Sequence, residues 1–388
     1  MRLLATYAKF TGPDPIQNSI EAAAKIRADF SGFDPAQVVF FSGVDYDGQR
    51  LAAEMRQAFP GAITFGCTSS GEIANGVMLR QSVAAMAFDR DTFDIFEMIV
   101  LPHAGPDRQL NDPAKLVDDA FAGFSARLGV PSMDNLDYSK YLFMVFADGS
   151  NYFIEPIMER AGDLTSVPFF GGMAGNDLLD NKCIQVFLNG EAHRDAAVLA
   201  LIKPKYRFAV LKTEGLVITD RAFTITDSDY ERRLLKTLDD RPAIEVYAEA
   251  IGTPVPEITM EKSFAQWPVG IMVGDEPFLR FPMKALPDGS MEFGHAIREG
   301  CRLKLCRLGG TLASTARALA DMEKKLGGIA GILHVNCMLR HRELEELGQL
   351  EEFGDLFKGY PNAGFSSHGE IYISIANMTS TMLVFAKD

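Results

Sequence analysis

The sequence has no long apolar run and no cluster of basic residues. Its longest apolar stretch is the seven-residue segment 196–202, whereas a helix that spans a bilayer needs about 20 apolar residues. The first nine residues lack the apolar core of a secretory signal. We therefore expect a cytoplasmic protein with no part in the membrane.

The sequence also lacks the motifs that usually mark several kinds of binding and catalytic sites. The five cysteines are an odd number without a C-x-x-C pair, which favours reduced thiols over disulfides or a zinc site. The formal net charge of −14 argues against nucleic acid as a partner. There is no H-E-x-x-H, P-loop or G-x-S-x-G motif, and no spacing that indicates a nucleophile with its base. A non-catalytic protein is therefore expected.

What the chain does contain is a repeated phrase. It reads Gly66-Cys67-Thr68-Ser69-Ser70-Gly71-Glu72-Ile73 and, near the other end, Gly364-Phe365-Ser366-Ser367-His368-Gly369-Glu370-Ile371. A third, degenerate copy is Phe170-Gly171-Gly172-Met173-Ala174-Gly175-Asn176-Asp177. The glycines indicate either tight turns or close approach of a ligand or of another backbone. Recurring copies could together line a cleft.

The surroundings of the phrase repeat as well. Each copy follows an apolar run of strand type and a stretch of helical periodicity, and a second apolar run comes after it. The preceding runs are 38–41, 142–146 and 331–335, and the following runs are 82–88, 196–202 and 381–385. The helical stretches are 49–59, 154–161 and 343–357. A strand-helix-strand-strand unit is therefore written about three times.

The length of 388 residues favours two domains, and we place the boundary after residue 204. The pattern predicts an α/β protein with mixed sheets flanked by helices, in domains 1–204 and 205–388. Beyond the boundary, short β-rich runs mix with helices expected at 229–238, 242–251 and 311–326.

These motifs, in this order, resemble the FIST family of bacterial sensory modules, with an N-terminal and a C-terminal part. The resemblance covers nearly the whole chain and includes Val167-Pro168-Phe169-Phe170-Gly171-Gly172-Met173-Ala174-Gly175, Val186-Phe187-Leu188-Asn189-Gly190 and Asp239-Asp240-Arg241-Pro242-Ala243-Ile244-Glu245-Val246-Tyr247. It also includes Asp288-Gly289-Ser290 and the second complete phrase.

Within the family the chain looks most like the nitric-oxide-sensing haem proteins called NosP. The similar stretches are His193-Arg194-Asp195-Ala196-Ala197-Val198-Leu199 and Asn336-Cys337-Met338-Leu339-Arg340. That resemblance implies a b-type haem on one histidine, nitric oxide as the signal, and a histidine kinase or a cyclic-di-GMP enzyme as partner. Other members of the family imply a small metabolite such as an amino acid as the ligand, without haem. A homo-oligomer is compatible with either.

Six histidines compete for the iron. We expect His193 as the axial ligand, because it precedes a buried strand and falls in the matching stretch, although a surface histidine would fit there too. His368, within the second phrase, is the next candidate, and His334 fits a core or cleft position. We expect His341, His295 and His103 to be exposed or structural.

The remaining candidates are polar residues and glycines near the same turns. Arg340 could pair with a haem propionate or an acidic ligand, since a guanidinium suits carboxylates, or could form a surface salt bridge. Gly171 and Gly172 would line the cleft. Glu72 and Glu370 are expected to hold the turns in place, and Cys67 and Cys337 to be packing residues. We therefore rank the possible functions as a haem sensor first, a metabolite-binding module second and an enzyme third.

Overall fold

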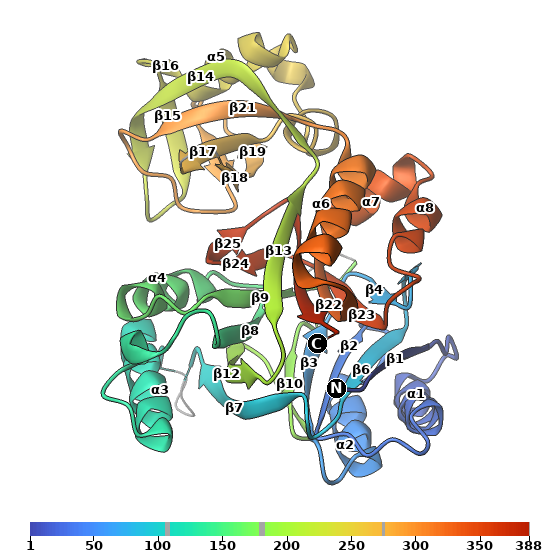
Figure 1. The fold of residues 1–388 in the computed structure, drawn as a ribbon. Helices are drawn as coiled ribbons and strands as arrows, with labels where there is room; N and C mark the ends of the chain where they lie inside the picture. Colours follow the sequence, from blue (N-terminus) through green and yellow to red (C-terminus); the bar gives the residue numbers. More distant parts are fainter. Residues whose placement is uncertain (105–108, 178–182, 274–275, 388) are drawn as a thin grey trace. The chain divides into compact units, whose positions relative to one another are not determined.

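The computed structural model describes residues 1–104, 109–177, 183–273 and 276–387 (Figure 1). The chain forms two compact units. Unit 1 comprises residues 1–213, 316–375 and 379–388, and unit 2 comprises residues 214–315 and 376–378. This division differs from the expected boundary after residue 204, because the chain returns to unit 1 and there adds the third repeat to the first two.

Unit 1 contains three copies of one supersecondary unit, as the repeated phrases predict. Repeat 1 consists of β2 (Gln37–Ser42), α2 (Gly48–Ala58), β3 (Ile63–Thr68), β4 (Glu72–Ala74), β5 (Val77–Leu79) and β6 (Val83–Phe88). Repeat 2 consists of β8 (Leu142–Asp148), α4 (Ile154–Leu164), β9 (Phe169–Ala174), β10 (Val186–Leu188), β11 (Glu191–His193) and β12 (Ala196–Pro204). Repeat 3 consists of β22 (Ile329–Cys337), α7 (Met338–Glu346), α8 (Leu350–Asp355), β23 (Asn362–Ser367), β24 (Glu370–Tyr372), β25 (Ser374–Ala376) and β26 (Thr379–Ala386).

The stretches between the repeats add flanking elements. They are β1 (Leu3–Ala8), α1 (Pro15–Asp29), β7 (Phe93–Pro102), α3 (Pro113–Leu128), the short 3-10 helix η1 (Met133–Asn135), β13 (Phe208–Glu214) and α6 (Thr311–Leu326). The helix expected at 343–357 is instead the pair α7 and α8, and the first of them begins directly after β22.

Each repeat contributes strands to two different sheets. Sheet 1 has the order β1-β6-β2-β3-β10-β11, sheet 2 the order β7-β12-β8-β9-β24-β25, and sheet 3 the order β13-β26-β22-β23-β4-β5. In every sheet the third and fourth strands are parallel, and the last two are a hairpin from another repeat. Repeat 1 thus completes sheet 3, repeat 2 completes sheet 1 and repeat 3 completes sheet 2.

The first glycine of each phrase lies where two backbones approach closely. A Cβ atom on Gly66 would lie 1.7 Å from the carbonyl oxygen of Phe40, and one on Gly171 would lie 1.8 Å from that of Val145. Gly364 stands in the same relation to His334, also at 1.8 Å. Of the two interpretations of these glycines, close approach of another backbone is therefore confirmed.

Apolar side chains fill the inner faces of the three sheets of unit 1 and the outer faces of sheets 1 and 2. The inner faces of the three sheets share one core, which includes Phe41, Phe146 and Phe365 in mutual ring contact. The outer face of sheet 1 packs against α1 and α2, and that of sheet 2 packs against α3 and α4. Figure 1 shows these helices in blue and green.

Unit 2 is built mainly from antiparallel strands. Its elements are β14 (Leu216–Asp229), β15 (Leu234–Leu238), β16 (Arg241–Pro242), α5 (Ala243–Ile251), η2 (Val255–Glu257), η3 (Met260–Phe264), β17 (Val269–Val273), β18 (Glu276–Arg280), β19 (Pro282–Ala285), β20 (Met291–Phe293) and β21 (Arg302–Leu308). The helix expected at 229–238 is wrong, because β14 and β15 pair as antiparallel strands there. Arg233 has φ 54°, a turn conformation that ends the helical periodicity.

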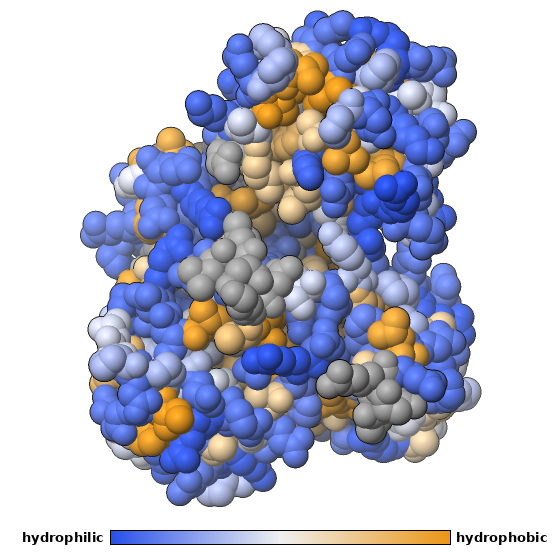
Figure 2. All heavy atoms as spheres, turned by 180° about the vertical axis from the view of Figure 1, so that it is seen from behind, coloured by the Kyte–Doolittle hydropathy of each residue, from blue (hydrophilic) through white to orange (hydrophobic). Residues whose placement is uncertain are grey.

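The surface is largely polar. Figure 2 shows hydrophilic residues over most of the visible face, with apolar residues in smaller groups. Among the described residues, no helix combines the length and the hydropathy that crossing a membrane requires.

Candidate functional site

The three phrase copies meet in a ring of backbone hydrogen bonds in unit 1. In each bond the residue four positions after the first glycine of a phrase donates its N–H to the carbonyl of the residue two positions after the first glycine of another phrase. The bonds are Ser70 to Ser366 at 2.9 Å, Gly175 to Thr68 at 3.2 Å and His368 to Met173 at 3.0 Å. Residues far apart in sequence are thereby held at one place, so the copies converge as expected.

Two buried carboxylates support this ring from equivalent positions. Glu72 accepts hydrogen bonds from Ser69 Oγ, from Ser82 N at 2.9 Å and from Ser82 Oγ at 2.6 Å. Glu370 accepts from Ser367 Oγ at 2.5 Å, from Thr379 N at 3.1 Å and from Thr379 Oγ1 at 2.8 Å. Each carboxylate ties its turn to the start of the next long strand. The structural role expected for both glutamates is confirmed.

Burial sets the protonation of these carboxyls. It raises the pKa of Glu72 and that of Glu370 to about 7, although the hydroxyl and amide donors act in the opposite direction. Repeat 2 has Val186 where the others have glutamate and Ala196 where they have Ser82 or Thr379. The acceptor and its hydroxyl donor are thus absent together from repeat 2.

His368 occupies a cradle made by two glycines. A Cβ atom on Gly175 would lie 2.3 Å from its Cδ2, and one on Gly149 would lie 3.1 Å from its Cβ. Its Nε2 accepts a hydrogen bond from Asn176 N at 3.3 Å. Burial lowers the pKa of the imidazole, so the ring is neutral at pH 7. His368 therefore fixes the turn of repeat 2 on that of repeat 3.

The outer face of sheet 3 is more polar than those of sheets 1 and 2. Strand register identifies the equivalent positions, since His334 pairs with Gly364 as Phe40 pairs with Gly66. The matched sets are His334 with Phe40 and Val145, Asn336 with Ser42 and Ala147, and Ser380 with Val83 and Ala197. With Arg340, His341 and Ser366 these residues form what we call the polar cluster.

Nδ1 of His334 and Oδ1 of Asn336, both in the polar cluster, have no hydrogen-bond partner in the described part of the chain. Both residues are fully buried. The other ring nitrogen of His334 lies 2.5 Å from Ser380 Oγ. Burial, and secondarily the charge of Arg340, lowers the pKa of His334 to about 3, so the ring is neutral. Unsatisfied buried polar atoms are costly and often mark a functional site.

The start of α7 supplies the rest of the cluster. His341 Nδ1 lies 2.9 Å from Ser366 Oγ, and burial lowers the pKa of this histidine to about 4. Arg340 is fully buried and donates to the carbonyl of Thr213 at 2.7 Å. The alternative of a surface salt bridge at Arg340 is therefore wrong. His341 is buried, so of its two expected settings, exposed or structural, the exposed one is excluded. Both side chains lie beyond the carboxyl end of a parallel strand, a common place for ligands.

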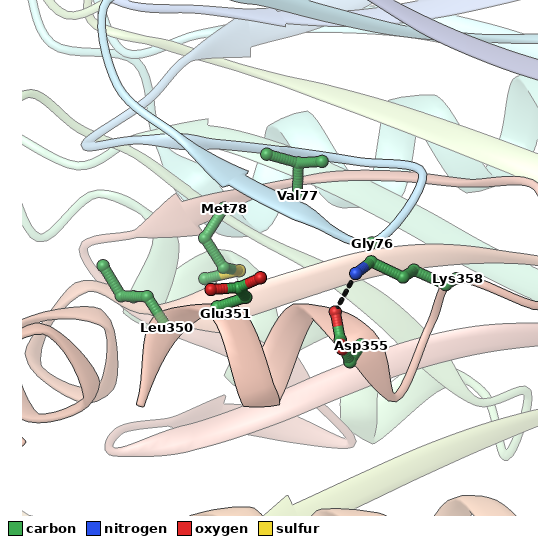
Figure 3. Close-up of a pocket in the computed structure, with 7 residues that line it drawn as sticks. All are labelled: Gly76, Val77, Met78, Leu350, Glu351, Asp355 and Lys358. Carbon is green, nitrogen blue, oxygen red and sulfur yellow. Dashed lines mark ion pairs between the residues drawn. The ribbon is translucent and has the colours of Figure 1, made fainter. Parts of the chain in front are cut away.

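Helix α8 separates this cluster from a surface pocket. On one side, the ring of Phe353 in α8 lies 6.1 Å from that of His334. On the other, α8 and the β4–β5 turn enclose a pocket of about 350 Å³ (Figure 3). The pocket is lined by Gly76, Val77, Met78, Leu350, Glu351, Asp355 and Lys358. Figure 3 shows the ion pair of Asp355 and Lys358 at its side.

His193 lies apart from the polar cluster, on β11 at the edge of sheet 1. Its side chain is 25% exposed, and its Nε2 lies 3.7 Å from the carboxylate of the exposed Glu191. A haem ligand needs an accessible imidazole and an apolar slot for the macrocycle. The imidazole is accessible at this strand edge, and its polar neighbour is the carboxylate of the exposed Glu191.

The other candidates are close to one another. Gly172 lies beside the C-terminal phrase at 364–371, since a Cβ atom there would lie 3.2 Å from the carbonyl oxygen of Gly369. Gly171 pairs with Ile371 in the ladder of β9 and β24, and His368 lies in the turn that precedes β24. Among the described residues, no group of three or more histidine, cysteine or acidic side chains is arranged to hold a metal ion. Cys67 and Cys337 are buried, as expected of packing residues.

Asn336, Ser366 and Ser380 were not singled out by the sequence patterns. A signal for them exists, because aligning the three repeats places polar residues in the third copy where the others are mostly apolar. That comparison needs the strand register, which the sequence alone leaves open.

Comparison with known proteins gives a family for both parts of the chain. The model of the FIST N domain matches residues 36–241, and that of the FIST C domain matches residues 243–373. No curated protein matches the sequence.

Similarity to solved structures is weak. A cyanuric acid hydrolase from A. caulinodans is 9% identical with a TM-score of 0.38, over 100% of both chains. T. maritima PurL complexed with AMPPCP is 10% identical with a TM-score of 0.23, over 98% of this chain and 72% of that chain. Similarity at this level supports no conclusion about function.

Proposed function

The chain belongs to the FIST family, and from this we propose that it is a non-catalytic sensory protein that binds a small polar molecule at the polar cluster of unit 1. FIST domains are sensory domains of signal-transduction proteins. Beyond this sensory role, we propose the place of binding, the class of ligand and a location in the cytoplasm.

One observation carries the proposal. Repeat 3 keeps the fold of the other repeats but carries His334, Asn336 and Ser380 on a helix-covered face, and two of their polar atoms have no partner among the described residues. Sheets of the same architecture in repeats 1 and 2 fold with mostly apolar residues there. The polar side chains are therefore not needed for the fold, which favours a functional role.

The donors and acceptors of the cluster define the ligand class. A guanidinium at Arg340 suits a carboxylate, while neutral imidazoles and the amide of Asn336 accept or donate single hydrogen bonds. An amino acid or another small carboxylic acid with a polar substituent matches this set. We propose that binding shifts α7 and α8, and that a histidine kinase or a cyclic-di-GMP enzyme responds to the shift.

The test is a thermal-shift screen of the full chain with the common amino acids and small carboxylic acids. Asn336→Ala places the residue of repeat 2 in repeat 3, and Ser42→Ala makes the equivalent change in repeat 1. We expect a ligand that raises the Tm of wild type and of Ser42→Ala but not of Asn336→Ala. A screen without any stabilising ligand, or a ligand that stabilises all three proteins equally, would contradict the proposal.

Haem-dependent sensing of nitric oxide is the second candidate. The partly exposed imidazole of His193 favours it, and its polar setting speaks against it. Protein produced with a supply of haem would then show a Soret band that moves on addition of nitric oxide, and His193→Ala would lose the band. Normal haem loading in His193→Ala would transfer the ligand role to His368 or His334, and protein without a Soret band would exclude this candidate.

A further inference from the structure

Unit 2 contains a second pocket, remote in sequence from the polar cluster. Its volume is about 550 Å³, and it is lined by Ile271, Met272, Cys301, Arg302 and Lys304. Volumes of 300–1,000 Å³ are usual for small-molecule sites. The pocket thus has the size for a ligand independent of the one proposed for unit 1.

The charge of this pocket is opposite to that of the chain. Arg302 and Lys304 are two residues apart on β21, so their side chains leave the strand on the same face. Within the described residues, neither side chain forms an ion pair or a hydrogen bond. In a chain of net charge −14, two cations without an acidic partner at one pocket make a local positive site.

The remaining lining is apolar or weakly polar. Ile271 and Met272 come from β17, which pairs with β21. The register, with Gly270 opposite Lys304 and Ile271 opposite Leu303, puts Met272 on the face of the two cations, where it provides apolar surface. Cys301 is a free, partly exposed thiol at the start of β21. A ligand that satisfies this lining has an anionic group for the cations and an apolar body for β17.

We propose that the pocket of unit 2 binds a small organic anion, a carboxylate or phosphate monoester with an apolar body. Arg302 and Lys304 hold the anionic group, and Met272 holds the body. Cys301 lies beside the bound molecule and reports its presence. This proposal does not depend on the function proposed for the polar cluster, since the residues involved belong to different units.

The thiol of Cys301 gives a direct test. The other exposed cysteine is Cys183, and Cys67, Cys306 and Cys337 are buried, so a Cys183→Ser background leaves Cys301 as the reactive thiol. The probes are an anionic aromatic disulfide, 5,5′-dithiobis(2-nitrobenzoate), and a neutral one, 4,4′-dithiodipyridine. In each reaction the thiolate attacks one sulfur, forms a mixed disulfide and releases one aromatic thiolate.

The measured quantity is the rate constant for the anionic probe divided by the rate constant for the neutral probe. This division removes any change in the thiolate fraction of Cys301, which affects both reactions. Replacing the two cations in Arg302→Gln/Lys304→Gln should lower the ratio by about tenfold. The control Lys262→Gln/Lys284→Gln removes the same charge from exposed positions of unit 2 outside the pocket lining and should leave the ratio within about twofold.

A competition experiment completes the test. Benzoate, an unreactive anion with an apolar body, should slow modification of Cys301 saturably in the Cys183→Ser background and have no such effect after Arg302→Gln/Lys304→Gln. An equal fall of the ratio in the control pair, or no saturable effect of benzoate, would overturn the proposal. Either result would leave the thermal-shift test of unit 1 unaffected.

Discussion

At the scale of single residues, Glu72 and Glu370 explain why the repeated phrase ends as it does. A fully buried carboxyl is unfavourable unless donors replace its water, and each of these accepts three hydrogen bonds from hydroxyl and amide groups. The sequence predicts the structural role from the matching positions of the two glutamates. It does not identify the donors Ser82 and Thr379, which lie outside the phrase.

We predict that Glu72→Val and Ser82→Ala are coupled. Glu72→Val alone should lower the free energy of unfolding by about 2 kcal/mol, because it leaves the donors of Ser69 and Ser82 buried without an acceptor. Ser82→Ala in addition reproduces the Val186 and Ala196 pair of repeat 2, and its further cost should be smaller than its cost in wild type by at least about 0.5 kcal/mol. Urea unfolding of wild type, the two single variants and the double variant measures this difference. Strictly additive changes in the free energy of unfolding would contradict the coupling.

A second residue prediction concerns the cradle of His368. Gly175→Ala should destabilise the protein by about 1–3 kcal/mol, because the new Cβ would overlap the imidazole. Gly162→Ala is the matched control, since a Cβ atom on Gly162, in helix α4, meets no other atom within 4 Å. That change should stabilise by about 0.5–1 kcal/mol. Equal effects of the two changes on the urea midpoint would argue against a close fit at His368.

At the scale of elements, the sequence predicts the order of strands and helices within each repeat better than the pairing of strands between repeats. Periodicity and the glycine phrases predict the strand, helix and strand order of all three copies. They do not predict that the hairpin of one repeat completes the sheet of another, because hydrogen bonding between remote strands leaves no local pattern. The β14–β15 hairpin was missed for a different reason, since its polar turn is rich in residues that also suit helices.

The exchanged hairpins lead to a prediction about distant strands. Gly76, in the turn of the β4–β5 hairpin, has φ 79°, and a Cβ atom there would lie 2.6 Å from Cγ of Lys358 and 2.9 Å from the carbonyl oxygen of Gly354. Gly76→Ala should therefore push the hairpin away from α8. We expect faster amide exchange in β23, the neighbour of β4 in sheet 3, although the two are far apart in sequence.

Gly129→Ala is the control for this change. Gly129 has φ 66°, so alanine experiences a similar backbone strain there, but a Cβ atom would meet no other atom within 4 Å. Hydrogen exchange in this variant should leave β23 unchanged. Equal loss of protection in β23 for both variants would indicate general destabilisation and refute the specific coupling of hairpin and sheet.

At the scale of the whole molecule, the family and the α/β class follow from the sequence, whereas the candidate site follows only in part, through Arg340 and His334. His193 stands out by resemblance and lies at a strand edge. Ser380 lies outside every quoted motif, and Asn336 falls in a similar stretch without being a candidate, yet both lie in the polar cluster. The difference arises because burial and missing hydrogen-bond partners depend on tertiary packing. The division into two units likewise depends on tertiary structure, because the chain re-enters unit 1 after residue 315.

Buried titratable groups of unit 1 predict how stability depends on pH. The raised pKa of Glu72 and Glu370, about 7, means that their contribution is present below 4.5 and is lost as pH rises through 7. The lowered pKa of His334, His341 and His368 means that their contribution is present above 6.5 and is lost as pH falls.

Between pH 4.5 and 6.5 the three histidines raise the free energy of unfolding with pH, and the two glutamates lower it. Because the histidines outnumber the glutamates, we expect this free energy to rise over the range and to fall above it, with a maximum at about pH 6.5. Urea unfolding followed by circular dichroism from pH 5 to 8.5 gives the curve. In Glu72→Gln/Glu370→Gln the fall above the maximum should be smaller. A steady rise in stability up to pH 8.5 would be inconsistent with protonated, buried glutamates.

The most direct test of ligand binding at the polar cluster is NMR of protein labelled with ¹³C in its histidine rings. The chain has six histidines, and substituting each in turn assigns its signal. On titration with the stabilising acid from the thermal-shift screen, we predict that the signals of His334 and His341 move together and saturate, while those of His103 and His193 stay in place. Movement of His193 alone, or of none of the six, would contradict binding at the cluster.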